Sequence, residues 1–398
     1  MIGHDRTMKK LFYAGIGLLA LFELANVYFI MPMPYSQRWR SIDVAFFLHS
    51  WRWLFRTVAG ILMLAGLAGV RRSTVWQRWA MGLSLLIAGG AVYAANFVLA
   101  ADAMFLQPQT VTMQPAARNV VEPARLVVGI EVNGDARAYP VQFIGYHHQV
   151  RDTVGGTPVM VTFCTVCRTG RVFSPLVGGA PETFRLVGMD HFNAMFEDRT
   201  TGSWWRQATG EAIAGPRKGT SLAEIRSEQM TLAEWLTLHP RSLVMQPDPV
   251  LRSEYSSGFD YETGRSRSTL TGTDAGSWGE KSWVVGITVN HKSRAYDWNR
   301  LRRERVVNDE LGGTPIVLVL APDDASFVAF ERPDARTRFG LRGNLLTAAD
   351  RTYDLGGTPT VAGAPTDVSA AGDRLKPVSA SQEFWHSWRT FHPGTDTY

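Results

Sequence analysis

The sequence of 398 residues contains only two cysteines, Cys164 and Cys167, separated by Thr165 and Val166. A structural zinc site with four cysteine ligands in one chain is therefore excluded, because such a site needs two cysteine pairs. The signature for covalent attachment of c-type haem is also absent. It requires a histidine directly after the second cysteine, and Arg168 stands at that position.

Several motifs of common enzymes are missing as well: a glycine-rich phosphate loop, a Gly-x-Ser-x-Gly nucleophile elbow and a His-Glu-x-x-His zinc-protease motif. The chain also lacks a basic surplus outside its N-terminal quarter. The first 100 residues carry a net charge of +7, and since the whole chain has a formal charge of +5, the remainder sums to −2. This distribution argues against nucleic-acid binding and assigns the basic residues to loops that flank membrane spans.

Three apolar runs are present in the N-terminal quarter, at 11–31, 53–70 and 79–101. Each approaches or exceeds the roughly 20 residues that an α-helix needs to cross a bilayer. Lys and Arg precede the first run and lie between the second and third, and none follows the third until Arg118. The positive-inside rule therefore predicts three spans in the inner or plasma membrane, a cytoplasmic N-terminus, and a periplasmic or extracytoplasmic region from residue 102 onward.

Two charged residues, Glu23 and Arg56, lie in or near these runs. A charge within a span is a functional candidate by default. The interpretation we favour here is a structural contact between spans, with Glu23 paired to Arg56 or to an Asn. The only histidine near the runs is His49, so a haem b site with two histidine ligands is not expected inside the membrane.

The region after the spans contains an internal repeat with a constant offset of 157 residues. Between 127–158 and 284–315, 15 of 32 positions are identical without a gap. This similarity predicts two homologous units, at 102–248 and 275–398, joined by a linker at 249–274. Residues 1–101 would form the membrane domain.

Each predicted unit combines short strands and glycine-rich turns with one late helix, at 231–238 and 381–391. The predicted fold class is therefore a membrane-anchored α+β protein, with three N-terminal transmembrane helices followed by a β-rich region of two tandem units.

Residues with metal-binding side chains flank a Gly-Gly-Thr-Pro turn at 155–158: His147 and His148 precede it, and Cys164 and Cys167 follow it. Alternating apolar residues on both sides predict two strands joined in a hairpin. In a hairpin the second strand runs back beside the first. We therefore expect His147 to lie on a strand and close to the cysteines. His148 should face the other side.

Thiolate and imidazole ligands suit Cu(I), Zn(II) or iron. We therefore predict a metal site formed by His147, Cys164 and Cys167, with His148 as a further ligand. Copper is favoured over zinc or iron, because its affinity is highest in the divalent series and thiolates select Cu(I). The second repeat lacks the cluster, since Glu304 aligns with His147.

Two other interpretations of the cysteine pair remain open. The predicted outside location is oxidising, so the pair could serve as a redox dithiol or as a disulfide staple. In the staple interpretation the protein is a non-catalytic binding or structural module of the cell envelope, and an envelope protein is compatible as its partner. The sequence assigns no catalytic residue, no substrate and no oligomeric state.

The order of motifs around the cysteines is distinctive. The motifs are Tyr139-Pro140, His147, Val150-x-Asp152, Gly155-Gly156-x-Pro158, Thr162-Phe163-Cys164-x-x-Cys167, Asp198-Arg199-x-Thr201-x-Ser203-x-Trp205-x-Gln207 and Gly215-Pro216. Together they resemble a bacterial family known as a domain of unknown function, family 3179. The resemblance covers roughly 120–248, with a weaker copy toward the C-terminus, and it implies no activity. His148 stands where the family usually has Glu, and Thr165-Val166 where it usually has Pro-Leu.

Overall fold

The structure is a computed structural model, and it describes residues 2–39, 41–67, 69, 73–349, 351–361, 364–365 and 374–398. The chain divides into two compact units. Unit 1 comprises Met1–Leu106, Thr183–Arg206 and Glu211–Thr220, and unit 2 comprises Gln107–Glu182, Gln207–Gly210 and Ser221–Tyr398. The predicted domain boundaries at 102, 248 and 275 rest on the sequence repeat, and they stay a prediction.

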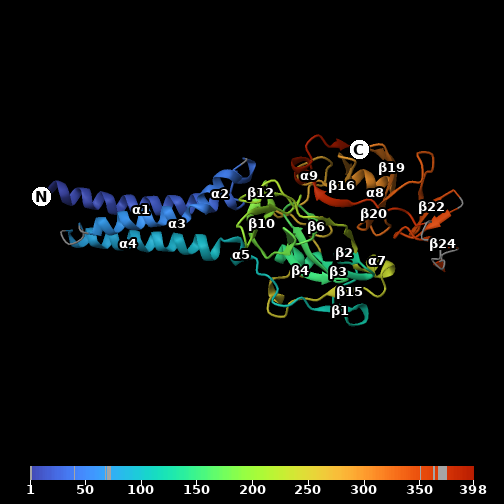
Figure 1. Ribbon diagram of the computed structural model, residues 1–398, viewed down its shortest axis with the longest axis horizontal. Helices are drawn as coiled ribbons and strands as arrows, with labels where there is room; N and C mark the ends of the chain where they lie inside the picture. The colour runs from blue at the N-terminus through green and yellow to red at the C-terminus, as the bar shows by residue number, and fades with distance from the viewer. Residues whose placement is uncertain are drawn as a thin grey trace. The chain divides into compact units, whose positions relative to one another are not determined.

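Unit 1 begins with helices, and α1, α3 and α4 run side by side (Figure 1). The helices of this unit are α1 (Ile2–Ile30), α2 (Ile42–Ser50), α3 (Arg52–Gly66), α4 (Val75–Tyr93) and α5 (Ala101–Met104), with a 3₁₀ turn at Ser36–Arg38 and a π-helical segment at Ala94–Val98. The start of α4 is fixed by a capping box, in which the Thr74 hydroxyl accepts from the Gln77 amide and the Gln77 side chain accepts from the Thr74 amide.

Two helical segments of the described chain are long and apolar enough to cross a membrane, Arg6–Ile30 and Val75–Val98. They correspond to the first and third predicted spans. The second predicted span, 53–70, coincides with α3, which has 15 residues. A helix of that length rises about 22 Å, less than the ~30 Å of a hydrocarbon core. Val70, the predicted end of this span, lies outside the described residues.

A polar cluster around the buried Glu23 joins the three helices. Glu23 of α1 is 1% exposed, and its carboxylate accepts from the Arg56 guanidinium of α3 at 2.8 and 3.1 Å. Asn96, in the π-helical segment, donates to Glu23 at 3.1 Å and accepts from Arg56 at 2.8 Å. The predicted structural contact between Glu23 and Arg56 is therefore present, and it includes the amide of Asn96.

Unit 1 also contains a four-stranded sheet, in the order β12 (Ala212–Ala214), β11 (Trp204–Arg206), β10 (Asn193–Asp198) and β9 (Phe184–Asp190). It packs on the helices: Phe46 of α2 meets Trp204 edge to face at 5.1 Å, and His49 lies 3.0 Å from the Glu197 carboxylate. Asp198 accepts from the Thr201 amide and from the Trp205 indole. Asp198 is therefore a structural residue of its turn.

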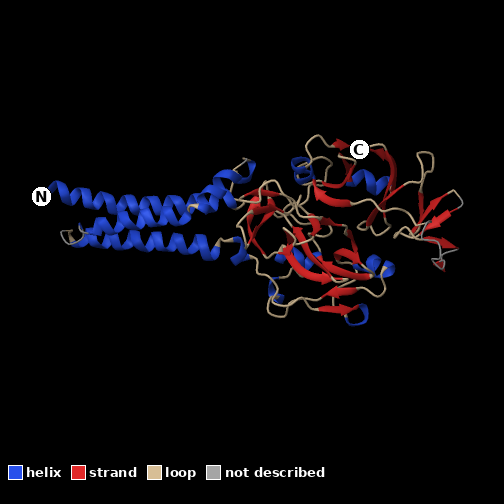
Figure 2. Ribbon diagram, viewed as in Figure 1, coloured by secondary structure: helices blue, strands red, loops and turns tan. Residues whose placement is uncertain are grey.

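Unit 2 is rich in β-strands (Figure 2). One of its sheets has the strand order β1 (Met113–Pro115), β15 (Leu243–Met245), β3 (Asp135–Pro140), β2 (Leu126–Val132), β14 (Glu228–Thr231). A second sheet has the order β13 (Glu224–Ile225), β6 (Thr169–Phe173), β5 (Thr157–Cys164), β4 (Gln149–Val154). A small ribbon pairs β7 (Leu176–Val177) with β8 (Ala180–Pro181), and the helices of this part are α6 (Val141–His147) and α7 (Leu232–Leu238).

The remaining sheets of unit 2 lie later in the chain. One sheet has the strand order β26 (Ala380–Phe384), β16 (Trp283–Val289), β17 (Lys292–Asp297), β27 (Asp396–Thr397). The next has the order β18 (Val306–Leu311), β19 (Thr314–Leu320), β20 (Phe327–Glu331). The last has the order β21 (Gly340–Arg342), β22 (Leu345–Ala348), β23 (Arg351–Tyr353), β24 (Pro359–Val361), β25 (Ala364–Pro365). The helices here are α8 (Trp298–Glu304) and α9 (Trp385–Phe391), and 3₁₀ turns lie at Ala116–Arg118 and Arg252–Glu254.

The two series of elements in unit 2 share their bounds. Adding 157 to both ends of β2, β3, α6 and β4 gives the bounds of β16, β17, α8 and β18. Side-chain contacts recur as well, since the Tyr139 hydroxyl donates to Asp152 at 2.7 Å and the Tyr296 hydroxyl donates to Asp309 at 2.8 Å.

A tryptophan of the late helix meets a strand glycine in each series. A Cβ at Gly129 would lie 2.3 Å from the ring of Trp235, and one at Gly286 would lie 2.1 Å from that of Trp388. Only glycine leaves room for each ring.

Several predicted local structures are confirmed. β4 and β5 form the hairpin predicted around Gly155 and Gly156, and both glycines have positive φ. The first late helix begins at Leu232, after Thr231 as its N-cap. The second begins later than predicted, because Ser381–Phe384 pairs with β16 as part of β26. Tertiary strand pairing overrides the local helical pattern there.

Candidate dithiol site

The two cysteines lie on one tight turn between β5 and β6. Cys164 is the last residue of β5, where it pairs with Thr169, and Cys167 lies two residues before β6 begins. Both side chains are fully buried in unit 2, and no disulfide joins them in this fully described turn. Two thiols are therefore held at the end of one hairpin.

His147 does not lie on a strand, so that prediction is wrong. It is the last residue of the short helix α6, and it is fully buried. Its Nε2 lies 2.8 Å from the hydroxyl of Tyr255, and its backbone carbonyl accepts from Gln107 at 2.9 Å. Burial raises the pKa of Tyr255 to about 12, so the hydroxyl stays protonated. The His147 ring thus has a structural partner at Nε2.

His148 ends α6 in the left-handed conformation, with φ of 62°, so strand alternation does not place its side chain. Its Nδ1 donates to the carbonyl oxygen of Tyr146 at 3.0 Å. Burial lowers the pKa of His148 to about 4, and the neighbouring His147 also lowers it, although the bond to Tyr146 opposes the shift. The ring is therefore neutral at physiological pH.

The predicted ligands do not form a metal cluster in the structure. Among the described residues, which include all four predicted ligands, no group of three or more His, Cys, Asp or Glu side chains is placed to hold a metal ion. The two thiols share one tight turn, and a metal site at this turn stays a prediction.

Three successive carbonyl groups of this turn are each held by another segment of unit 2. The Tyr261 hydroxyl donates to Thr165 O at 3.0 Å, and the His386 ring donates to Val166 O at 3.2 Å. The backbone amide of Phe384 donates to Cys167 O at 2.9 Å. These partners lie far from the cysteines in the sequence, and no motif pointed to them.

The electrostatics of the turn also involve Tyr261 and Lys281. Burial raises the pKa of Tyr261, and the charges of Cys164 and Cys167 raise it further, while Arg168 opposes this shift. Burial lowers the pKa of Lys281, and Cys167 is the largest of the charges that oppose that shift. Tyr261 is therefore a neutral donor to the turn, and a negative charge at Cys167 would favour the charged form of Lys281.

Arg168, directly after Cys167, fixes the other end of the turn. Its φ is 57°, and its guanidinium donates to the Gln382 side chain at 2.7 Å and to the carbonyls of Tyr261 and Glu262 at 2.9 and 3.0 Å. It also stacks on the ring of Trp283 at 3.7 Å. The turn is thereby tied on both sides to residues outside the first predicted repeat.

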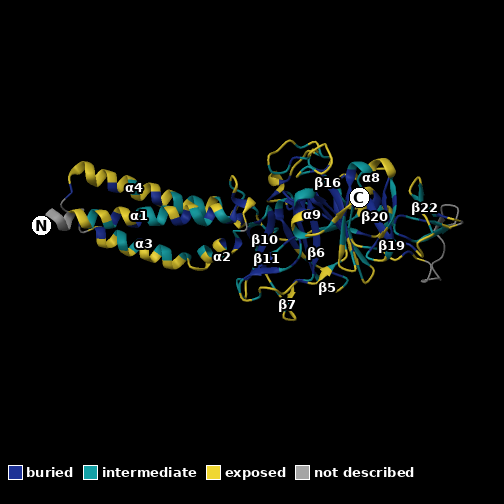
Figure 3. Ribbon diagram, turned by 90° about the horizontal axis from the view of Figure 1, so that it is seen from above, coloured by how far each residue is buried: buried dark blue, intermediate teal, exposed yellow. Residues whose placement is uncertain are grey.

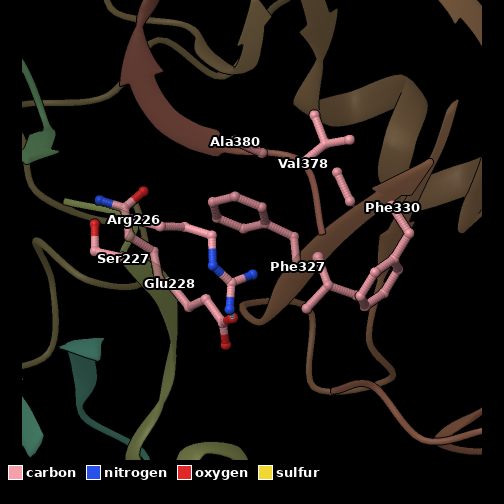
Figure 4. Close-up of a pocket in the computed structure, with 10 residues that line it drawn as sticks. Arg226, Ser227, Glu228, Phe327, Phe330, Val378 and Ala380 are labelled. Atoms are coloured by element: carbon pink, nitrogen blue, oxygen red, sulfur yellow. Dashed lines mark ion pairs between the residues drawn. The ribbon is translucent and has the colours of Figure 1, made fainter. Parts of the chain in front are cut away.

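A cavity of about 500 Å³ lies beside Arg168, with Trp283, Phe259 and Gln382 among its lining residues. A second, much smaller pocket of about 20 Å³ is lined by Arg226, Glu228, Phe327 and Phe330 and others from β14 and β20 (Figure 4). That volume holds about one water molecule, so the small pocket offers no room for an organic ligand.

Comparison with curated proteins and with solved structures finds no match for this chain. One family model, described as a protein of unknown function (DUF3179), matches residues 105–395. The match spans both predicted repeat units and includes the cysteine turn together with the residues that hold it. The chain therefore belongs to the DUF3179 family of proteins of unknown function.

Proposed function

We propose that the protein is a membrane-tethered extracytoplasmic protein that binds one Cu(I) ion between the thiolates of Cys164 and Cys167. The observation that carries this proposal is the fixed turn. Its three carbonyls from Thr165 to Cys167 are held from outside the hairpin, and both thiols are buried without a disulfide. A preorganised pair of soft donors is suited to a soft metal ion.

The number of donors favours Cu(I) over zinc. Structural zinc takes four ligands and catalytic zinc takes three protein ligands plus water, whereas the described residues contain no group of three or more His, Cys, Asp or Glu side chains that could hold a metal ion. His147 is engaged with Tyr255. Bound copper would supply a soft, redox-active centre, and the chain's own residues would hold the two sulfurs and exclude water.

The direct test is a titration of the reduced protein with Cu(I) under anaerobic conditions, after purification without a metal-affinity column. The expected result is one Cu(I) per chain, bound by deprotonated thiols, so affinity falls as the pH is lowered. Absence of binding by the reduced protein refutes the proposal. A disulfide that resists strong reductant would instead support the staple function, and ready thiol–disulfide exchange without metal binding would support a redox dithiol.

The membrane tether has three spans in this proposal, with α3 as the second. The side of α3 that faces away from the bundle is apolar and exposed, at Leu54, Val58, Ile61 and Leu64 (Figure 3). Its Arg56 is paired with Glu23 of α1. A short helix is accommodated in a bilayer by local thinning and by side chains that reach the interface.

The number of spans decides the side on which the dithiol lies. With three spans, alkaline phosphatase fused after Ser73 should be inactive, and the same enzyme fused after Asp102 should be active, with a difference of about tenfold or more. A cytoplasm-only reporter at both sites serves as the control and should give the opposite pattern. If α3 does not cross, both fusions reverse, and the thiols lie in the cytoplasm.

The two predicted repeat units descend, in our proposal, from one duplicated β-rich unit. The shared bounds at an offset of 157, the two Tyr–Asp hydrogen bonds and the two Trp–Gly contacts support this origin. The first copy carries the thiols, and the second copy supplies Phe384 and His386 to the turn.

A further inference from the structure

The cavity of about 500 Å³ in unit 2 has aromatic side chains in its walls. Phe259, Trp283 and Trp298 line it, and the rings of Trp283 and Trp298 meet edge to face with their centroids 5.6 Å apart. Small-molecule sites are concave, lined mainly by apolar and aromatic side chains, and typically have volumes of about 300–1,000 Å³. The size and the aromatic lining of this cavity therefore suit a flat organic molecule.

Two buried side chains of the lining have N–H groups that no protein group accepts. Gln382 is 5% exposed, and its side-chain oxygen accepts from Arg168 at 2.7 Å. Because a guanidinium only donates, the oxygen of Gln382 must face it, and the NH₂ group is left to donate elsewhere. Within the described chain, no residue accepts from that NH₂ group or from the indole N–H of Trp298, which is also 5% exposed. Buried donors of this kind require an acceptor from water or from a ligand.

The three carboxylates of the lining, in contrast, are engaged with other protein groups. They belong to Glu262, Asp323 and Asp324. Glu262 accepts from an arginine and a backbone amide, Asp323 accepts from two hydroxyl groups, and Asp324 pairs with two arginines. With these three acids against Arg168 and Arg302, the described lining residues have no positive surplus that would attract an anion. The cavity therefore offers a ligand hydrogen-bond donors rather than acceptors or net positive charge.

We propose that this cavity binds an uncharged, planar aromatic molecule that presents a hydrogen-bond acceptor, such as a ring carbonyl, to Gln382 and Trp298. The flat rings of the lining would pack against the ligand, and the two unpartnered donors would orient it. The cavity draws on both predicted repeats and on the segment between them, which supplies Phe259. This inference goes beyond the Cu(I) proposal and does not depend on it.

Coumarin and indole are suitable probes, because both are flat two-ring molecules but coumarin only accepts hydrogen bonds and the indole N–H only donates. Equilibrium dialysis of the full-length protein in detergent, with protein-free micelles as the blank, measures the affinity of each. We expect coumarin to bind with a Kd of about 1 mM or lower. It should bind at least about tenfold more tightly than indole, which cannot satisfy the buried donors. Coumarin that does not bind saturably, or binds no better than indole, overturns the inference and leaves the cavity to water.

Gln382→Glu tests the donor directly, because it keeps an oxygen for Arg168 and replaces the NH₂ group with a second acceptor. Its coumarin affinity should fall by at least about tenfold, whereas its indole affinity should not fall. Gln109→Glu makes the same change at an exposed glutamine outside the cavity lining. It should leave both affinities within about twofold, because an exposed charge is screened. An unchanged coumarin affinity in Gln382→Glu, or an equal loss for both probes, overturns the inference.

Discussion

Replacing either Cys164 or Cys167 with serine should lower the Cu(I) affinity by about a hundred- to a thousandfold. The thiolate is the ligand, and a hydroxyl cannot take its place as a soft donor. Structural zinc sites bind with roughly 10–16 kcal/mol shared among four ligands, so the loss of one thiolate should remove a large part of the binding free energy. The measurement is Cu(I) affinity by competition with a bicinchoninate chelator, on the reduced protein under anaerobic conditions.

Two control variants separate the loss of a ligand from damage to the fold. Cys164→Ala should lose copper binding to the same extent as the serine variant, without adding a polar group to a fully buried position. His147→Ala should keep one Cu(I) per chain, since its Nε2 is engaged with Tyr255. It should nevertheless lower the free energy of unfolding by about 1–3 kcal/mol, because the buried Tyr255 hydroxyl loses a partner.

The outcomes distinguish the hypotheses that the sequence left open. If His147→Ala loses copper binding as fully as the cysteine variants, the three-ligand site predicted from the sequence is correct and the two-thiol site is not. If Cys164→Ser binds one Cu(I) with unchanged affinity, the metal site lies elsewhere in the chain. Retention of the fold is checked by the thermal transition of each metal-free variant.

The hairpin that carries the thiols could be predicted from the sequence because its information is local. Gly155 and Gly156 adopt the positive φ values that the turn requires, and alternating apolar residues on both sides set the register of β4 and β5. The contact between Glu23 and Arg56 could also be predicted, because a charge in an apolar helix must find a partner.

The position of His147 could not be predicted in the same way. Residues 141–147 form a helix of two turns that is buried on several sides, with Val141, Phe143 and Ile144 among the buried residues. A short apolar run of this kind has the same pattern in a buried strand and in a buried helix. The prediction from the sequence therefore placed His147 on a strand, with its imidazole close to the thiols.

The residues that hold the cysteine turn could not be predicted from the sequence either. Tyr261, Lys281 and His386 are separated from Cys167 by about 90 to 220 positions and belong to no motif. Lys281 precedes β16 and His386 follows β26, and these two strands pair in a register that sets Phe384 opposite Trp283. Tyr261 comes from a separate segment that Arg168 binds. Local pattern contains no information on such a tertiary contact, and the second repeat lacks the cysteine–histidine cluster that drew attention to the first.

The second large effect is expected at the buried ion pair between Arg125 and Glu262. Glu262→Ala should lower the free energy of unfolding by about 3–5 kcal/mol, because Arg125 would remain buried without its counter-charge. The Arg125 guanidinium lies 2.7 Å from one oxygen of Glu262, and the backbone amide of Leu126 donates to the other at 2.6 Å. For a unit of this size the thermal midpoint should fall by about 6–20 °C.

The matched control lies three residues further along the same segment. Arg265 pairs with Asp260 at 3.3 Å, and both side chains are 69% exposed. Arg265→Ala should change the free energy of unfolding by only about 0–1 kcal/mol, because an exposed ion pair is screened by water and by salt. An equal loss of stability in the two variants would show that the segment tolerates no change, and that burial of the Arg125–Glu262 pair is not the cause.

Glu262→Ala should also loosen the dithiol turn, because the same stretch of chain holds both. The carbonyls of Tyr261 and Glu262 accept from Arg168, and the Tyr261 hydroxyl donates to Thr165 O. When the Glu262 carboxylate no longer anchors the segment, these acceptors lose their fixed position. The alkylation rate of the cysteines in the native protein should then rise by about tenfold or more, since the rate follows local opening. In Arg265→Ala it should stay unchanged. A destabilised Glu262→Ala protein whose thiols stay as protected as before would mean that the turn is held by the second repeat alone, through Phe384 and His386.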